Sequence, residues 1–252
     1  MDCEKFMLLN NTIKEDIEKG HSFYMIVQNN PKINITKRTL YNYQESGYFT
    51  TKNIDLPRRI RYKKRKRYVG KTKKDKIIRI GRTYKDFQEY IANNSITHFV
   101  ELDTVEGVKG KECLLTMAFI PENFYKYFNI ILTDNGSEFT NVLDIENNSG
   151  IIKDSKVFFC DPYRSDQKAG LEVTHSYIRR YIETGQNFTK YTNNQILDMT
   201  NNINSANREK HDGKTPYEKI IERIDVKILD KFGYKKINSK DVILNGRLGC
   251  ST

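Results

Sequence analysis

The sequence lacks any run of about 18 apolar residues, the length that a membrane-spanning helix requires. We therefore expect no membrane span and no membrane partner. The first residues, MDCEKFMLLNN, contain neither a basic segment nor an apolar stretch of the kind found in signal peptides, so no secretory signal is expected. Both absences favour a cytoplasmic protein.

Cysteine is also scarce. The chain of 252 residues has four cysteines, and none is spaced from another cysteine or a histidine as zinc ligands are: Cys3, Cys113, Cys160 and Cys250. This excludes a zinc finger, and free thiols fit a reducing, cytoplasmic setting. The length and the hydrophobic content of 37% suffice for a core in one or two domains.

Excess charge of one sign is confined to a single segment, residues 58–76, which we call the basic segment. It reads RRIRYKKRKRYVGKTKKDK and holds twelve Lys and Arg with one Asp, which accounts for the whole formal net charge of +11. Such blocks are usually solvated and often bind polyanions. Nucleic acid is favoured over a membrane surface because no amphipathic helix accompanies the charge. The side chains expected to contact DNA are Arg58, Arg59, Arg61, Lys63, Lys64, Arg65, Lys66 and Arg67.

Residues 12–49 predict three short helices. Their N-cap candidates are Thr12, Ser22 and Thr36, and Gly20 and Gly47 are placed to end the first and third helices. Two helices, a short turn and a third helix form the helix-turn-helix pattern. The third helix would direct Leu40 into the core and present to a major groove Lys37, Arg38, Tyr41 and Asn42. A generic helical bundle is the alternative, and the adjacent basic segment favours DNA binding.

The rest of the chain predicts a mixture of strands and helices. A helix should begin at the capping box of Thr83 and Asp86, and another after Thr215, which is followed by Pro216. Strands are expected at residues 98–105, 111–120, 129–136 and 155–162, the first two as a hairpin. Further helices are expected at residues 165–185, 193–206 and 216–232. The predicted class is α/β.

Three acidic residues occupy unusual places in these elements. Asp103 interrupts an apolar strand, Asp134 ends another, and Glu172 lies early in a helix. Asp134 precedes Asn-Gly, so a simple turn residue is one reading. If the two strands are parallel neighbours, the aspartates lie side by side and the helix can bring Glu172 to them. Such a cluster needs cations, and two Mg²⁺ or Mn²⁺ ions about 3.5–4 Å apart suit phosphodiester chemistry.

Five segments, in order, resemble bacterial insertion-sequence transposases that carry helix-turn-helix modules before a DDE integrase core. The segments are NIDLPRRIRYKKRKR, VELDTVEG, IILTDNGSEF, FFCDPYRSDQKAGLEVTHSYIRR and GKTPYE. The resemblance implies an RNase H-like mixed sheet with flanking helices, and DNA strand cleavage and transfer that depends on Mg²⁺. It places the catalytic and metal-binding triad on Asp103, Asp134 and Glu172, and it directs His175 and Arg179 toward the active site and DNA.

The resemblance also implies a domain order and partners. We expect a helix-turn-helix domain at residues 1–56, a basic linker with a short helix at 57–97, the catalytic core at 98–206 and a helical tail at 207–252. The partners would be inverted-repeat element ends, target DNA and further copies of the chain on DNA, with no small-molecule substrate and a place at the nucleoid.

Two features depart from the family pattern. Asp103 and Asp134 are only 31 positions apart, about half the usual spacing, and a further front-end helix-turn-helix is missing. We therefore expect an N-terminally truncated and internally shortened member of the family. A remnant that binds DNA without catalysis is the alternative function, and an RNase H-type nuclease that does not join strands is a third.

Overall fold

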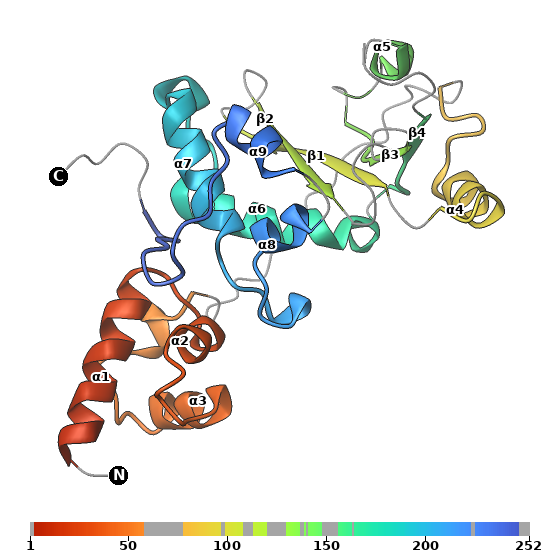
Figure 1. Cartoon of the computed structure of the whole chain (residues 1–252). Coiled ribbons are helices and arrows are strands. Elements are labelled where there is room, and N and C mark those ends of the chain that lie inside the picture. The colour runs from red at the N-terminus through yellow and green to blue at the C-terminus, as the bar shows by residue number, and fades with distance from the viewer. Residues whose placement is uncertain are drawn as a thin grey trace. The chain divides into compact units, whose positions relative to one another are not determined.

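The computed structural model describes residues 3–57, 78–96, 99–107, 113–119, 130–136, 139, 141–147, 156–162, 164–222 and 225–246 (Figure 1). The chain forms two compact units. The terminal unit comprises Met1–Lys66, Arg180–Ile182 and Tyr191–Thr252, and the sheet unit comprises Arg67–Arg179 and Glu183–Lys190. The front helices and the C-terminal segment thus share one unit, a grouping that the sequence-based division did not contain. The predicted domain boundaries stay predictions.

Helix α1 (Cys3–Glu18) opens the terminal unit. Its buried side chains Leu9, Ile13 and Ile17 recur every fourth residue, which places them on one face of the helix. The predicted start at Thr12 is wrong. The Thr12 hydroxyl instead donates to the carbonyl of Leu8 at 3.0 Å, within the helix. The apolar spacing that begins at Leu9 therefore overrides the local capping pattern.

Helices α2 (Phe23–Asn29) and α3 (Lys37–Glu45) confirm the other two front-end predictions. The Ser22 hydroxyl accepts from the backbone N–H of Met25, and the Thr36 hydroxyl accepts from that of Thr39. Leu40 is completely buried in a core that α1, α2 and α3 share. A short 3₁₀ turn, η1 (Asn53–Asp55), follows these helices.

The later helices of the terminal unit are α7 (Asn193–Asn204), α8 (Pro216–Ile221) and α9 (Val226–Lys231), with the 3₁₀ turn η6 (Glu209–His211) after α7. The predicted helix start after Thr215 is confirmed, and Thr215 forms a capping box with Glu218. The single helix predicted over residues 216–232 is wrong. Asp225 has an extended backbone and its side chain accepts from the N–H of Lys227, so it caps a second helix there.

Residues 234–246, the C-terminal strap, cross the end of α1 and the start of α2. His21 is completely buried and its Nε2 lies 2.7 Å from the carbonyl oxygen of Val242. The strap approaches Gly20 closely, and its residue Leu244 is completely buried. Gly20 has φ +82°, a conformation that favours glycine, and an added Cβ would meet the strap backbone at 3.2 Å. Glycine is therefore required at this crossing.

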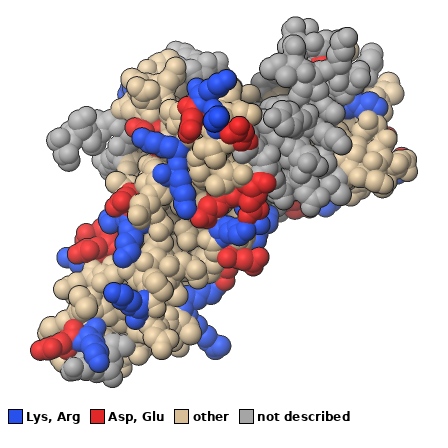
Figure 2. Space-filling view, in the orientation of Figure 1, with Lys and Arg blue, Asp and Glu red and all other residues tan. Residues whose placement is uncertain are grey.

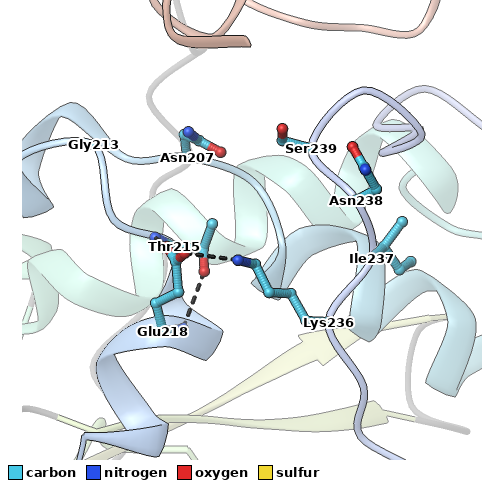
Figure 3. A pocket seen from close by; sticks show the side chains of 8 residues that line it. All are labelled: Asn207, Gly213, Thr215, Glu218, Lys236, Ile237, Asn238 and Ser239. Carbon is cyan, nitrogen blue, oxygen red and sulfur yellow. Dashed lines mark hydrogen bonds and ion pairs between the residues drawn. The ribbon is translucent and has the colours of Figure 1, made fainter.

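A polar pocket of about 340 Å³ lies beside the strap (Figure 3). Across it, the Lys236 ammonium reaches the Glu218 carboxylate at 2.7 Å, and the other oxygen of Glu218 accepts from the backbone N–H of Thr215. Glu218 thereby joins the strap to the start of α8.

The sheet unit contains β1 (Val100–Glu106), β2 (Cys113–Phe119), β3 (Ile130–Thr133) and β4 (Lys156–Phe159) in the order β2-β1-β3-β4. Strand β1 pairs with β2 antiparallel, and β1, β3 and β4 are parallel. This confirms the predicted hairpin and the α/β class, and the mixed sheet is compatible with an RNase H-like core. Strands β1 and β3 are parallel neighbours, the condition under which Asp103 and Asp134 were expected to lie side by side. Residues 120–129, where the chain is expected to be shortened, lie outside those described.

Each face of the sheet packs against a helix. On one face, Phe87 of α4 (Tyr84–Asn93) meets Ile130, Leu132 and Phe158. On the other, Val142 of α5 (Val142–Asn147) joins a cluster that contains Val100, Leu102, Ile131, Val157 and Phe159. The capping box of Thr83 and Asp86 at the start of α4 is confirmed. Each face thus carries an apolar cluster, as expected for strands covered on both sides.

The remaining elements follow β4. The 3₁₀ turn η4 (Ser165–Lys168) leads directly into α6 (Ala169–Tyr181), and the 3₁₀ turn η5 (Phe188–Lys190) comes later. A helix is therefore present within the predicted residues 165–185, but the α-helix itself is shorter and begins only after the 3₁₀ turn.

Candidate active site

A row of four polar or thiol side chains crosses the sheet on the α4 face. From β2 to the end of β4 it runs through Thr116, Asp103, Asp134 and Cys160. Strands β1 and β3 pair in parallel up to Leu102 and Thr133, and the next residue of each is an aspartate. Residues in register on adjacent strands point to the same face. The two aspartates therefore lie side by side, as predicted.

Each aspartate divides its oxygens between the backbone and one shared lysine. Oδ1 of Asp103 accepts from the N–H of Thr104 at 2.8 Å, and Oδ1 of Asp134 accepts from the N–H of Gly136 at 3.0 Å. The Oδ2 atoms of Asp103 and Asp134 lie 2.9 Å and 3.6 Å from Nζ of Lys168. Two carboxylates on adjacent strands thus converge on a single cation.

Asp134 makes the local contact of a turn residue and also lies beside Asp103, while its metal-binding role stays a prediction. Its bond to Gly136 is the short local contact of a turn residue. Its other oxygen belongs to the carboxylate pair. The turn at Asp134 does not lead into a hairpin, because β3 pairs in parallel with β4, the next described strand, and α5 lies between the two in the chain.

Lys168 is one component of this site that the sequence analysis missed. It is the last residue of η4, and only 7% of its side chain is exposed. Its Nζ makes two close ion pairs, and it has no partner at hydrogen-bond geometry among the described residues. The sequence feature that could have revealed Lys168 is its spacing from Glu172. Lys168 precedes Glu172 by four residues, and residues four apart share a helix face. A helix that brings Glu172 to the aspartates therefore brings Lys168 there as well.

A further acid, Glu101, positions the start of α6. Glu101 lies on the same face of β1 as Asp103 and is only 3% exposed. Its Oε2 accepts from the backbone N–H of Leu171 at 3.3 Å. Carboxylates stabilise helix N-termini, where backbone N–H groups lack partners within the helix. Glu101 thus ties β1 to the first turn of α6.

His175 of α6 touches the same row. Its Nε2 lies 2.6 Å from the hydroxyl of Thr116, and its Nδ1 lies 3.9 Å from Oδ2 of Asp103. The Thr116 hydroxyl donates its hydrogen to the carbonyl of Asp103 at 3.0 Å, so Nε2 of His175 must be the donor to Thr116. The DNA contact predicted for this residue stays a prediction.

Arg179 and Glu172 complete the predicted residues of α6. The Arg179 guanidinium donates to the carbonyls of Glu106, at 2.7 Å, and Glu183, at 3.4 Å. Burial lowers the pKa of Arg179. Its DNA contact stays a prediction. Glu172 lies on α6, and its side chain is outside the part of the chain that the structure describes.

The chemistry of the two aspartates fits a divalent ion. Carboxylate oxygens are the ligands that Mg²⁺ prefers, and the Lys168 ammonium shows that one cation can reach both groups. Among the described side chains, no group of three or more His, Cys, Asp or Glu is placed to hold a metal. Asp103 and Asp134 would be two of the three predicted ligands, and the side chain of the third, Glu172, lies outside the described part of the chain.

Two known proteins are similar to this chain. Over 210 residues it is 29% identical to the "Probable transposase for insertion-like sequence element IS1161" of Streptococcus salivarius, an alignment that covers 73% of this chain and 58% of that protein. Over 124 residues it is 32% identical to the "Transposase for insertion sequence element IS4351" of Bacteroides fragilis, which covers 48% and 37%. The chain is a relative of bacterial insertion-sequence transposases.

The match to these transposases is partial in length. The chain spans 58% of one relative and 37% of the other. No family model matches the chain, and no solved structure matches it. Among the described helices, none combines the length and apolar character needed to cross a membrane.

In this transposase relative, the predicted recognition residues of α3 differ in their surroundings. Arg38 and Asn42, four residues apart, are both exposed. Lys37 forms an ion pair with Glu209, and its ammonium lies 5.7 Å from the centre of the Tyr24 ring. Tyr41 packs edge-on against Phe23 with ring centroids 4.8 Å apart. Arg38 and Asn42 are therefore the most accessible pair, and the DNA contacts of all four stay predictions.

The described surface carries no comparable concentration of charge in the view of Figure 2, where basic and acidic side chains are interspersed. The basic segment, with Arg58, Arg59, Arg61, Lys63, Lys64, Arg65, Lys66 and Arg67, lies outside the described residues. Its role in DNA binding stays a prediction from composition.

Proposed function

We propose that this chain is a DDE-type DNA transposase with an RNase H-like core. It binds the inverted-repeat ends of a mobile element and cleaves and joins DNA strands with Mg²⁺ or Mn²⁺. One observation carries the proposal: Asp103 and Asp134, on adjacent parallel strands, converge on one cation. The similarity to two named transposases supports the DNA-processing role.

The residues of the row have distinct tasks in this proposal. Asp103, Asp134 and Glu172 would hold the ions, which when bound activate a water or 3′-hydroxyl and stabilise the leaving oxygen. Backbone N–H groups fix one oxygen of each aspartate, so the other is held in a defined direction. Glu101 fixes the start of α6, and therefore the backbone from which Glu172 projects.

DNA binding would involve two further parts of the chain. Helices α2 and α3 form the helix-turn-helix, with Arg38 and Asn42 suited to guanine and adenine edges in the major groove. The basic segment contacts phosphates on element-end DNA and on target DNA alike. The active form is a homo-oligomer on DNA, and the protein is cytoplasmic and associated with the nucleoid.

The test uses the full chain and DNA that carries the inverted repeats flanking its gene. Purified protein with Mn²⁺ should nick the labelled end DNA and join it to a target plasmid, and EDTA should abolish both reactions. Asp103→Asn and Asp134→Asn should still bind the DNA but neither nick nor join it. Equal nicking by the wild type and both variants would contradict the proposal.

A remnant that binds element ends without catalysis is the second candidate. One observation favours it: the Lys168 ammonium already neutralises part of the aspartate pair in the metal-free protein. This candidate predicts end-specific DNA binding with no cleavage at any concentration of Mn²⁺.

A further inference from the structure

We propose that Lys168 is a positioning residue that serves as an internal counter-ion of the aspartate pair, and that a divalent metal binds by displacing its ammonium. The inference rests on the proposed function, because it assumes that the pair is a metal site. It adds a competitor to that site, so that metal affinity depends on a residue that is not itself a ligand.

The first support is the direction of the carboxylate oxygens. Oδ1 of each aspartate is held by a backbone N–H, from Thr104 or Gly136. Oδ2 of each faces Nζ of Lys168. The oxygens that the backbone leaves available to a cation are therefore the two that contact the ammonium, and an ion bound between them would take the place of Nζ.

The second support is electrostatic. Two carboxylates and one ammonium leave a net negative charge, so the pair still attracts cations when Lys168 is in place. A divalent ion brought to the same oxygens would be repelled by an ammonium within a few ångströms, since only 7% of the Lys168 side chain is exposed and solvent screens it little. Metal and ammonium therefore exclude each other from the pair.

The third support is the place of Lys168 in the chain. It ends the 3₁₀ turn η4, at the point where α6 begins, and a lysine side chain has four flexible methylene groups. The ammonium can leave the pair by rotation about side-chain bonds without displacing the sheet. In the metal-free state it suppresses the repulsion between Asp103 and Asp134, which keeps both carboxylates in place for the metal.

A purely structural ion pair makes a different prediction, which a substitution separates. Lys168→Met keeps the length and removes the charge. It should lower the metal-free melting temperature and bind Mn²⁺ about tenfold more tightly, within the usual range for coupling between competing ligands. Mn²⁺ should therefore raise its melting temperature more than that of the wild type. Lys168→Arg should restore an affinity close to that of the wild type.

The matched control is Lys236→Met, which removes a lysine ion-paired with Glu218 in the terminal unit. It should leave Mn²⁺ affinity unchanged. Calorimetric titration with Mn²⁺ gives the affinities directly and requires no DNA. An affinity of Lys168→Met equal to or weaker than that of the wild type would overturn the proposal.

A second measurement uses the wild-type chain and does not depend on a folded variant. Brief acetylation of lysines, followed by peptide mass spectrometry, reports which ammonium groups are accessible. Labelling of Lys168 should rise several-fold on addition of Mn²⁺, while labelling of the exposed Lys85 stays constant. Unchanged or reduced labelling of Lys168 in Mn²⁺ that saturates the site would overturn displacement.

The outcomes distinguish this inference from the proposed function. Tight Mn²⁺ binding by Lys168→Met without DNA cleavage by the wild type supports the displacement and contradicts the enzyme. DNA cleavage by the wild type with equal Mn²⁺ affinity in wild type and Lys168→Met supports the enzyme and contradicts the displacement. Absence of Mn²⁺ binding by either protein overturns both.

Discussion

The buried carboxylate of Glu101 accepts a hydrogen bond from the backbone N–H of Leu171, 3.3 Å away. This bond joins the strand that carries Asp103 to the helix that carries Glu172. Glu101→Ala should lower the free energy of unfolding by about 1–3 kcal/mol, because it leaves a buried N–H without its acceptor. Glu101→Gln retains an acceptor and should cost less. Urea unfolding measures both, and a change below about 0.5 kcal/mol in Glu101→Ala, the size of a typical surface effect, would contradict this role.

Cys160, at the end of the same row, predicts a pH dependence of stability. Burial raises the pKa of its thiol from 9.0 to about 12, and the negative charges of Asp134, Glu101 and Asp103 act in the same direction. The unfolded thiol loses its proton near pH 9 while the folded thiol keeps it. Stability should therefore fall as the pH rises from about 9 to 12, by at most about 1.4 kcal/mol per pH unit from this group. Stability curves of wild type and Cys160→Ala that stay parallel above pH 9 would contradict the assignment.

The exposed pair on α3 predicts sequence-specific binding. Arg38→Ala should weaken binding to the element end by about 1–3 kcal/mol and spare random DNA, since a base contact is lost. Lys37→Ala is the neighbouring control, and because Lys37 is paired with Glu209 its effect should be smaller. Fluorescence anisotropy on both DNAs gives the comparison. Equal losses on cognate and random DNA would assign Arg38 to the phosphate backbone.

The basic segment predicts the salt dependence of DNA binding. Each neutralised phosphate contributes about −0.9 to the slope of log K against log salt on B-DNA. Replacing the five consecutive residues 63–67 with glutamine should therefore flatten the slope by several units if these residues contact phosphates. Filter-binding titrations from low to moderate salt measure it, and an unchanged slope would remove the segment from the DNA interface.

The sequence predicted what depends on neighbours along the chain. Thr36, Thr83 and Thr215 each cap a helix through a residue three positions on, which a local pattern reveals. The adjacency of Asp103 and Asp134 followed from the assumption of parallel strands, and the observed register bears it out.

Long-range contacts were beyond the reach of those patterns. Lys168 and Glu101 enter the site only once α6 is placed on β1. The C-terminal strap meets the end of α1, more than 200 positions away along the chain, where the N–H of Leu244 donates to the carbonyl of Lys19. The start of α1 was misplaced because the capping pattern at Thr12 is not used, and the buried face that begins at Leu9 determines where the helix forms.

The central claim is that Asp103 and Asp134 form a divalent-metal site. Asp134→Asn tests it with little disturbance, because the asparagine side-chain oxygen can still accept from the N–H of Gly136. The measurement is thermal unfolding of wild type and Asp134→Asn, each with and without Mn²⁺. In hundredfold excess over its dissociation constant, Mn²⁺ stabilises the folded wild type by about 2.7 kcal/mol.

For a chain of this length, that stabilisation raises the melting temperature by about 5 °C or more. Asp134→Asn should lose most of this rise and unfold without metal at a temperature close to that of the wild type. If Asp134 served the turn alone, its replacement by asparagine would keep the bond to Gly136 and leave the rise caused by Mn²⁺ as large as in the wild type. A wild type whose melting temperature does not respond to millimolar Mn²⁺, or a rise that Asp134→Asn retains in full, would contradict the metal site.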